Sequence, residues 1–98
     1  PFLRRAVELL PADARSRYEL ARVLHALADY PAGLAAVREA VRLNPADPEA
    51  RTYLADFLRL TGDGPGSDAE ARAAARLAPN DSRPFSILAD NARVRQDW

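Results

Sequence analysis

The sequence predicts an all-α solenoid in which antiparallel pairs of helices repeat with a period of 34 residues. The first observation is a stretch, residues 40–47, that recurs 34 positions earlier and later, at 6–13 and 74–81. Each copy runs from an apolar helical pattern through a proline to an aspartate, and a fixed period of this length is typical of repeat arrays. The second observation is that apolar residues between the copies recur at helical spacing, without the alternation that is typical of strands.

The first half of the chain contains three expected helices, over residues 2–10, 14–27 and 32–43. Apolar residues form one stripe on the first of them, and Pro11 ends it. Asp13 follows at a position where its carboxylate can accept from the free N–H groups of the next helix. Pro31 favours the start of the third helix, because its missing N–H is not needed there.

Three more helices are expected in the second half, over residues 48–60, from residue 67 or 68 to 77, and after residue 81. Asp47 and Asp81 are the expected N-caps of the first and last of these. Residues 61–66 contain three of the chain's four glycines and a proline. We therefore expect the loosest turn here, and a following helix that begins late or is frayed, capped by Ser67 or Asp68.

Superimposing the chain on itself at 34 residues aligns large and small apolar residues in neighbouring columns. A small residue beside a large one is what close packing of antiparallel helices requires. The spacing and the columns resemble the tetratricopeptide repeat, whose pattern is W-x2-L-G-x2-Y…A-x3-F…P. The columns that carry the resemblance are Leu20-Ala21, Leu54-Ala55 and Leu88-Ala89, then Ala6, Ala40 and Ala74, and then Pro11, Pro45 and Pro79.

Several positions depart from that pattern. Arg17 and Arg51 replace the early aromatic residue of the first helix, and Gly64 replaces the turn aromatic that Tyr30 supplies one repeat earlier. Ser67 and Asp68 stand where the family has small and aliphatic residues.

By this resemblance the whole chain is a single array, and each unit of the array consists of two helices. Residues 14–47 and 48–81 are whole units, residues 1–13 are the second helix of a truncated unit, and residues 82–98 are the first helix of a further unit. Repeats cannot bury their apolar faces alone. We therefore expect either a fragment of a longer array or another chain that covers the ends.

The amino-acid composition bears on which partners the protein can have. Fourteen arginines balance fourteen acidic residues, so nothing attracts nucleic acid, and no apolar run is long enough to cross a bilayer. We expect neither nucleic acid nor membrane as a partner, and a cytoplasmic location. The 21 alanines and the absence of lysine indicate a GC-rich, bacterial coding sequence.

No catalytic, cofactor or metal site is expected. His25 is the single histidine, with Asp29 one turn further on, and there is no cysteine, so a set of three or four metal ligands is missing. The serines have no other histidine to activate them. The glycine-rich stretch at 62–66 has neither a preceding strand nor a following lysine, as a phosphate loop would. The chain is expected not to be an enzyme.

The resemblance implies a concave face, lined by the first helix of each unit, that binds extended peptides or helices. Its inward columns carry Arg15, Tyr18, Glu19, Arg22, His25, Glu49, Thr52, Tyr53, Asp56, Arg59, Arg83, Ser86, Ile87, Asp90 and Arg93. Tyrosine and arginine are enriched at binding hot spots. The residues expected to contact a peptide are Arg15, Tyr18, Arg22, His25, Tyr53, Asp56, Arg59, Arg83 and Ile87.

The family's best-known groove holds a C-terminal carboxylate with lysine and asparagine. Only Arg22 and Arg83 could do similar work here, so such a clamp is not expected. The expected function is therefore a non-enzymatic scaffold for protein–protein interaction. Two alternatives stay open: a docking or regulatory segment of a larger enzyme such as a transferase, and self-association through the end helices.

Overall fold

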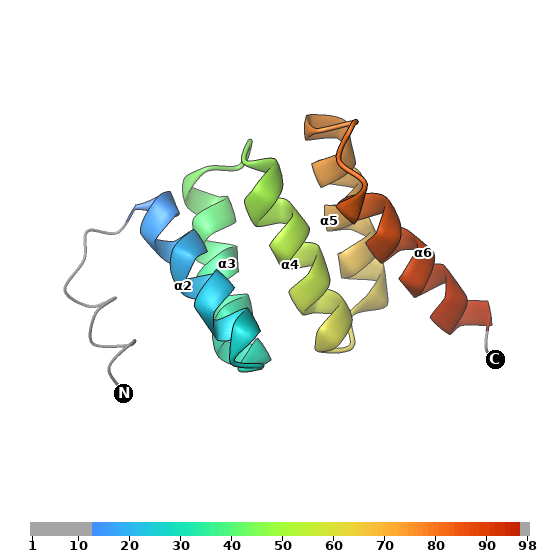
Figure 1. Cartoon of the computed structure of the whole chain (residues 1–98), viewed down its shortest axis with the longest axis horizontal. Helices are drawn as coiled ribbons and strands as arrows, with labels where there is room; N and C mark the ends of the chain where they lie inside the picture. Colours follow the sequence, from blue (N-terminus) through green and yellow to red (C-terminus); the bar gives the residue numbers. More distant parts are fainter. Residues whose placement is uncertain (1–12, 97–98) are drawn as a thin grey trace.

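The computed structural model describes residues 13–96, which form five α-helices and no strand (Figure 1). The expected helix over residues 2–10 lies outside the described residues. The helices are α2 (Ala14–Ala26), α3 (Tyr30–Leu43), α4 (Pro48–Leu60), α5 (Gly64–Leu77) and α6 (Arg83–Gln96). The all-α repeat architecture predicted from the sequence is confirmed.

The helices stack as successive antiparallel hairpins. The first helix of each hairpin packs on its second, α2 on α3 and α4 on α5, and each second helix packs on the next first one, α3 on α4 and α5 on α6. The result is an elongated array, 44 Å by 26 Å by 17 Å (Figure 1). Along it, α2, α4 and α6 are the first helices and α3 and α5 the second helices.

The main core lies where α2, α3 and α4 meet. Val37 and Phe57 are fully buried there, and Ala21 lets the backbones of α2 and α3 approach closely. Gly33 on α3 faces the ring of Phe57, and a Cβ at this position would come within 2.4 Å of two of its ring carbons. The glycine is therefore required by this close contact between α3 and α4.

Aspartates cap the helices where the sequence predicted caps. Asp13 accepts from the N–H of Ser16 at 2.7 Å, and Asp47 accepts from that of Glu49 at 3.0 Å. Ahead of α6, Asp81 accepts from the N–H of Arg83 at 3.0 Å. These carboxylates satisfy donors that have no partner within their helix.

The expectation that the second helix of the second unit begins late was wrong. The helix α5 begins at Gly64 and has 14 residues, as does α3. Asp63 caps it by accepting from the N–H of Gly66 at 2.9 Å, and Pro65 lies in the first turn, where a proline is favoured. Ser67 and Asp68 are not caps but buried residues inside the helix.

Candidate functional site

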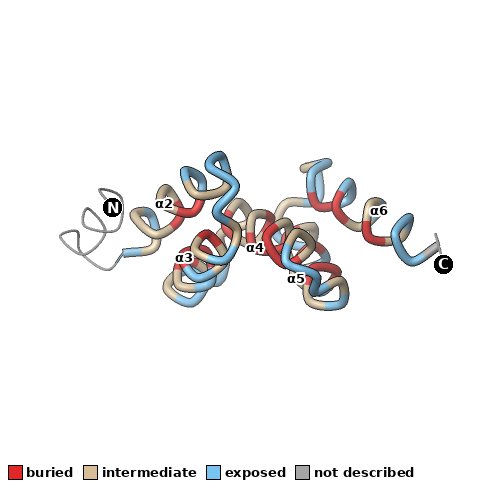
Figure 2. The backbone as a smooth tube through the Cα atoms, turned by 90° about the horizontal axis from the view of Figure 1, so that it is seen from below, coloured by how far each residue is buried: buried red, intermediate tan, exposed pale blue. Residues whose placement is uncertain are grey.

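Among the three first helices, α4 lies between α2 and α6 (Figure 2). A cavity of about 330 Å³ lies between these three helices. Its lining residues all come from α2, α4 and α6, because helical register turns one face of each first helix to the same side. They are His25, Thr52, Tyr53, Asp56, Arg83, Ser86, Ile87 and Asp90, and we call this cavity the groove.

Five of the nine residues predicted to contact a peptide line the groove, namely His25, Tyr53, Asp56, Arg83 and Ile87. The other four, Arg15, Tyr18, Arg22 and Arg59, do not line it. Three further lining residues, Thr52, Ser86 and Asp90, occupy inward columns of the repeat but were not among the nine. Register alone could have added them, since each lies three or four residues from a predicted position.

Aromatic rings support the groove on the α2 side. Tyr18 is buried and meets Tyr53 edge to face, with 5.7 Å between ring centroids. The His25 ring packs in the same way on Tyr53 and on Phe57, at 5.4 Å and 5.2 Å. The guanidinium groups of Arg15 and Arg22 both lie over the Tyr18 ring, at 5.7 Å and 5.9 Å. These contacts pack the rings against one another on the α2 side of the groove.

An ion-pair cluster closes one end of the groove. His25 Nε2 lies 2.6 Å from Asp56 Oδ2, while Arg59 donates to Asp56 Oδ1 at 2.8 Å. The sequence had placed Asp29 one turn after His25, but Asp29 instead caps α3. Asp56 is therefore held from α2 and from its own helix, and its charge is compensated inside the protein.

A second cluster lies at the other end. Arg83 of α6 donates through Nη1 to Glu49 of α4 at 3.0 Å and also pairs with Asp81. The hydrogen bonds from Arg83 lower the pKa of Asp81 to about 2, and they also lower the pKa of Glu49. Burial, together with the nearby charge of Glu49, raises the pKa of Tyr18 to about 12. Its neutral hydroxyl donates to Glu49 at 3.4 Å.

Chemically, the groove offers an apolar floor and hydrogen-bonding walls. Among residues 13–96, no group of three or more His, Cys, Asp or Glu side chains is arranged to hold a metal ion. The helices of the described part are also too short and too polar to cross a membrane.

Residues 14–57, from the start of α2 into α4, match the family model described as tetratricopeptide repeat. Residues 14–57 therefore form a tetratricopeptide repeat. The helical hairpins continue with the same packing beyond the matched residues, through α5 and α6. No curated protein matches the chain.

Tetratricopeptide repeats generally mediate protein–protein interaction. In this tetratricopeptide repeat protein the inward arginines are already engaged by its own acids. Arg22 pairs with Glu19 at 3.3 Å, and Arg83 pairs with Glu49 and Asp81. Because both guanidinium groups already form ion pairs within the protein, neither is free to bind a ligand carboxylate.

Proposed function

We propose that the protein is a non-enzymatic scaffold that binds a peptide or helix of a partner protein in the groove. The observation that carries the proposal is the cavity between α2, α4 and α6, whose walls come entirely from the first helices. Its volume, about 330 Å³, is at the lower end of the range for ligand pockets and suits one or two side chains of a bound segment.

The groove favours an apolar anchor in the ligand. Ile87 and Tyr53 form its floor, and the charge of Asp56 is compensated within the protein by Arg59. A buried apolar or aromatic anchor is the usual centre of a binding hot spot, with polar groups at its rim. Ser86 and Asp90 supply such a rim on α6 and can bond to the backbone of an extended segment.

The test is a selection of random displayed peptides on the immobilised protein, followed by binding measurements with two variants. Ser86→Arg places a long cation over the groove, and Ser86 is exposed, so the fold tolerates the change. Ser82→Arg adds the same charge at an exposed position outside the groove. We expect Ser86→Arg to weaken binding at least about tenfold, as for loss of a hot spot, and Ser82→Arg to leave it unchanged. Equal affinity of both variants for every selected peptide would refute the groove as the binding site.

Self-association through the end of the array is a second candidate. Leu20 and Leu24 of α2 occupy the columns of Leu54 and Leu58, which are buried on α4, yet both are only half-buried. A cavity of about 320 Å³ lies beside them between α2 and α3. Light scattering across a wide concentration range tests this candidate, and a monomer at every concentration would rule it out.

A further inference from the structure

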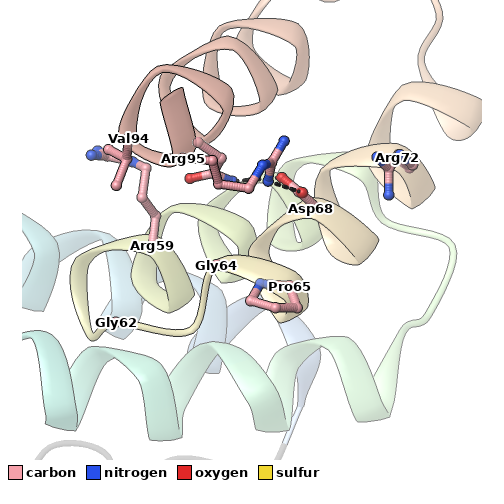
Figure 3. A pocket seen from close by; sticks show the side chains of 9 residues that line it. Arg59, Gly62, Gly64, Pro65, Asp68, Arg72, Val94 and Arg95 are labelled. Carbon is pink, nitrogen blue, oxygen red and sulfur yellow. Dashed lines mark hydrogen bonds and ion pairs between the residues drawn. The ribbon is translucent and has the colours of Figure 1, made fainter. Parts of the chain in front are cut away.

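A second cavity, of about 370 Å³, lies outside the groove, where the end of α4 meets α5 and the last turns of α6 (Figure 3). We call it the side cavity. Arg59 and Val94 stand at one end of it and Arg72 at the other, with Arg95 and Asp68 between them (Figure 3). Its lining residues are Arg59, Gly62, Gly64, Pro65, Asp68, Arg72, Asn91, Val94 and Arg95.

The same junction one unit earlier is filled with aromatic rings. The columns of Arg59, Gly64 and Asn91 carry His25, Tyr30 and Phe57 there. These three rings pack edge to face, with centroids 5.2 Å to 6.3 Å apart, and Phe57 is fully buried. The helix pairs repeat, so the side cavity exists because three ring-bearing residues have been replaced by an arginine, a glycine and an asparagine.

The replaced junction is polar as well as hollow. Asp68, which stands in the column of Leu34, accepts from Asn91 Nδ2 at 2.9 Å and from Arg95 Nη1 at 2.6 Å. Asn91 also donates to Ser67 Oγ at 2.9 Å, and that hydroxyl donates to the carbonyl of Ala55 at 2.7 Å. Burial opposes the ionisation of Asp68, but these hydrogen bonds and the charges of Arg95 and Arg72 keep its pKa below the usual value. Buried polar groups of this kind cost stability relative to an apolar core, which points to a use other than packing.

One arginine of the side cavity is not engaged in an ion pair. Arg59 is paired with Asp56 and Arg95 with Asp68, at 2.8 Å and 2.6 Å. Arg72, on the exposed side of α5, also lines the cavity and has no ion pair within residues 13–96. The amino end of α5 forms part of the same wall, and Asp63 offsets the positive end of the helix dipole there.

We infer that the side cavity binds the carboxylate side chain of an Asp or Glu from a protein segment, with Arg72 as its main partner. A single carboxylate can pair with Arg72, the lining arginine that has no ion pair within residues 13–96, whereas a phosphate dianion would bring a second negative charge close to Asp68. A guanidinium binds a carboxylate through two parallel hydrogen bonds. Val94 and Pro65 offer apolar surface to the stem of the ligand side chain.

A further helix of the array would not contact α5, which carries Arg72. A further helix in the same geometry would lie relative to α5 as α5 lies relative to α3. The helices α3 and α5 make no contact within 8 Å between Cα atoms. The site is also separate from the groove, so its test does not depend on the proposed function.

The experiment is an NMR titration of the ¹⁵N-labelled protein with three probes: acetyl-glutamate methylamide, its neutral glutamine counterpart, and inorganic phosphate. We expect the glutamate probe to shift the amide signals of residues 62–68 and 91–95 in a saturable way. The glutamine probe should shift them little, and phosphate should bind more weakly than the glutamate probe. Arg72→Gln should weaken binding of the glutamate probe about tenfold, the usual effect of losing a charge-assisted pair.

Two controls make the result decisive. Arg38→Gln changes the exposed arginine in the same column of the ring-filled junction and should leave binding intact. Gly64→Tyr with Asn91→Phe restores two of the three rings of that junction and should abolish binding while the protein stays helical. Equal binding of both glutamate and glutamine probes, tighter binding of phosphate, or full binding by Arg72→Gln would each overturn the proposal. The Arg72→Gln result remains informative even if the double variant fails to fold, because Arg72 is exposed and its replacement should not disturb the fold.

Discussion

Ala28 and Gly62 occupy the same position in the turns that join the two helices of successive units, and both have a positive φ, of 60° and 95°. The hydrogen bonds of the two turns also match: Asp29 N–H donates to the carbonyl of Leu24, as Asp63 N–H does to that of Leu58. This left-handed backbone suits glycine and is unfavourable for alanine, whose Cβ approaches the carbonyl oxygen.

Exchanging the two residues should therefore change stability in opposite directions. We expect Ala28→Gly to raise the free energy of unfolding by about 0.5–1 kcal/mol, since relief of strain exceeds the added entropy of the unfolded chain. Gly62→Ala should lower it by about 1 kcal/mol or more. Urea denaturation measures both, and effects of the same sign would contradict the common turn geometry.

Tyr18, which packs on Tyr53 of the groove, has a measurable titration. Its pKa in the folded protein is about 12, above the ordinary value of 10.0. The folded state therefore holds this proton more tightly than the unfolded state. The stabilisation is complete below pH 10 and is lost as the pH rises towards 12. Subtracting the ultraviolet titration of Tyr18→Phe from that of the wild type should leave a phenol with a midpoint near 12, whereas a midpoint near 10 would disagree with its burial beside Glu49.

At the scale of the element, the start of α5 was the part of the fold that sequence reasoning predicted wrongly. Glycine content at residues 62–66 suggested a loose turn, but the cap by Asp63 and the position of Pro65 outweigh it. Ser67 and Asp68 were interpreted as caps because their true partners, Asn91 and Arg95, lie more than 20 residues away. Local patterns cannot show such partners.

The cap can be tested against its counterpart in the first unit. Asp63→Ala should destabilise the protein by about 1 kcal/mol, as loss of an N-cap usually does. Asp29→Ala, at the start of α3, should do the same, because its carboxylate also accepts from the first turn. Thermal unfolding measures both changes. If Asp63→Ala left stability unchanged while Asp29→Ala lowered it, the result would favour a frayed start of α5.

At the scale of the whole molecule, the period of 34 residues was enough to predict the helical pairs, because the pattern of apolar residues, prolines and aspartates repeats with it. It also placed all the residues of the groove on one face of the first helices. The period could not show how far each column is buried, nor that His25 pairs with Asp56 on a neighbouring helix. It likewise could not reveal the side cavity, which arises where the second unit departs from the first.

Burial along the array should be reflected in stability. Leu54 is 6% exposed, with α3 packed on its helix, whereas Leu20 in the same column is half-buried. We expect Leu54→Ala to lower the free energy of unfolding by about 2–5 kcal/mol, because it leaves a cavity in a packed core. Leu20→Ala should cost distinctly less. Urea denaturation compares them, and equal losses would mean that α2 is covered as fully as α4.

The most direct test of the central claim, that the groove binds a partner segment, is to locate a selected peptide on the protein by NMR. The account predicts that the peptide shifts the signals of Tyr53, Asp56, Ile87 and Asp90 and leaves the outer surfaces of α3 and α5 unaffected. Signals that shift on α3 and α5 while those of the groove stay in place would contradict it.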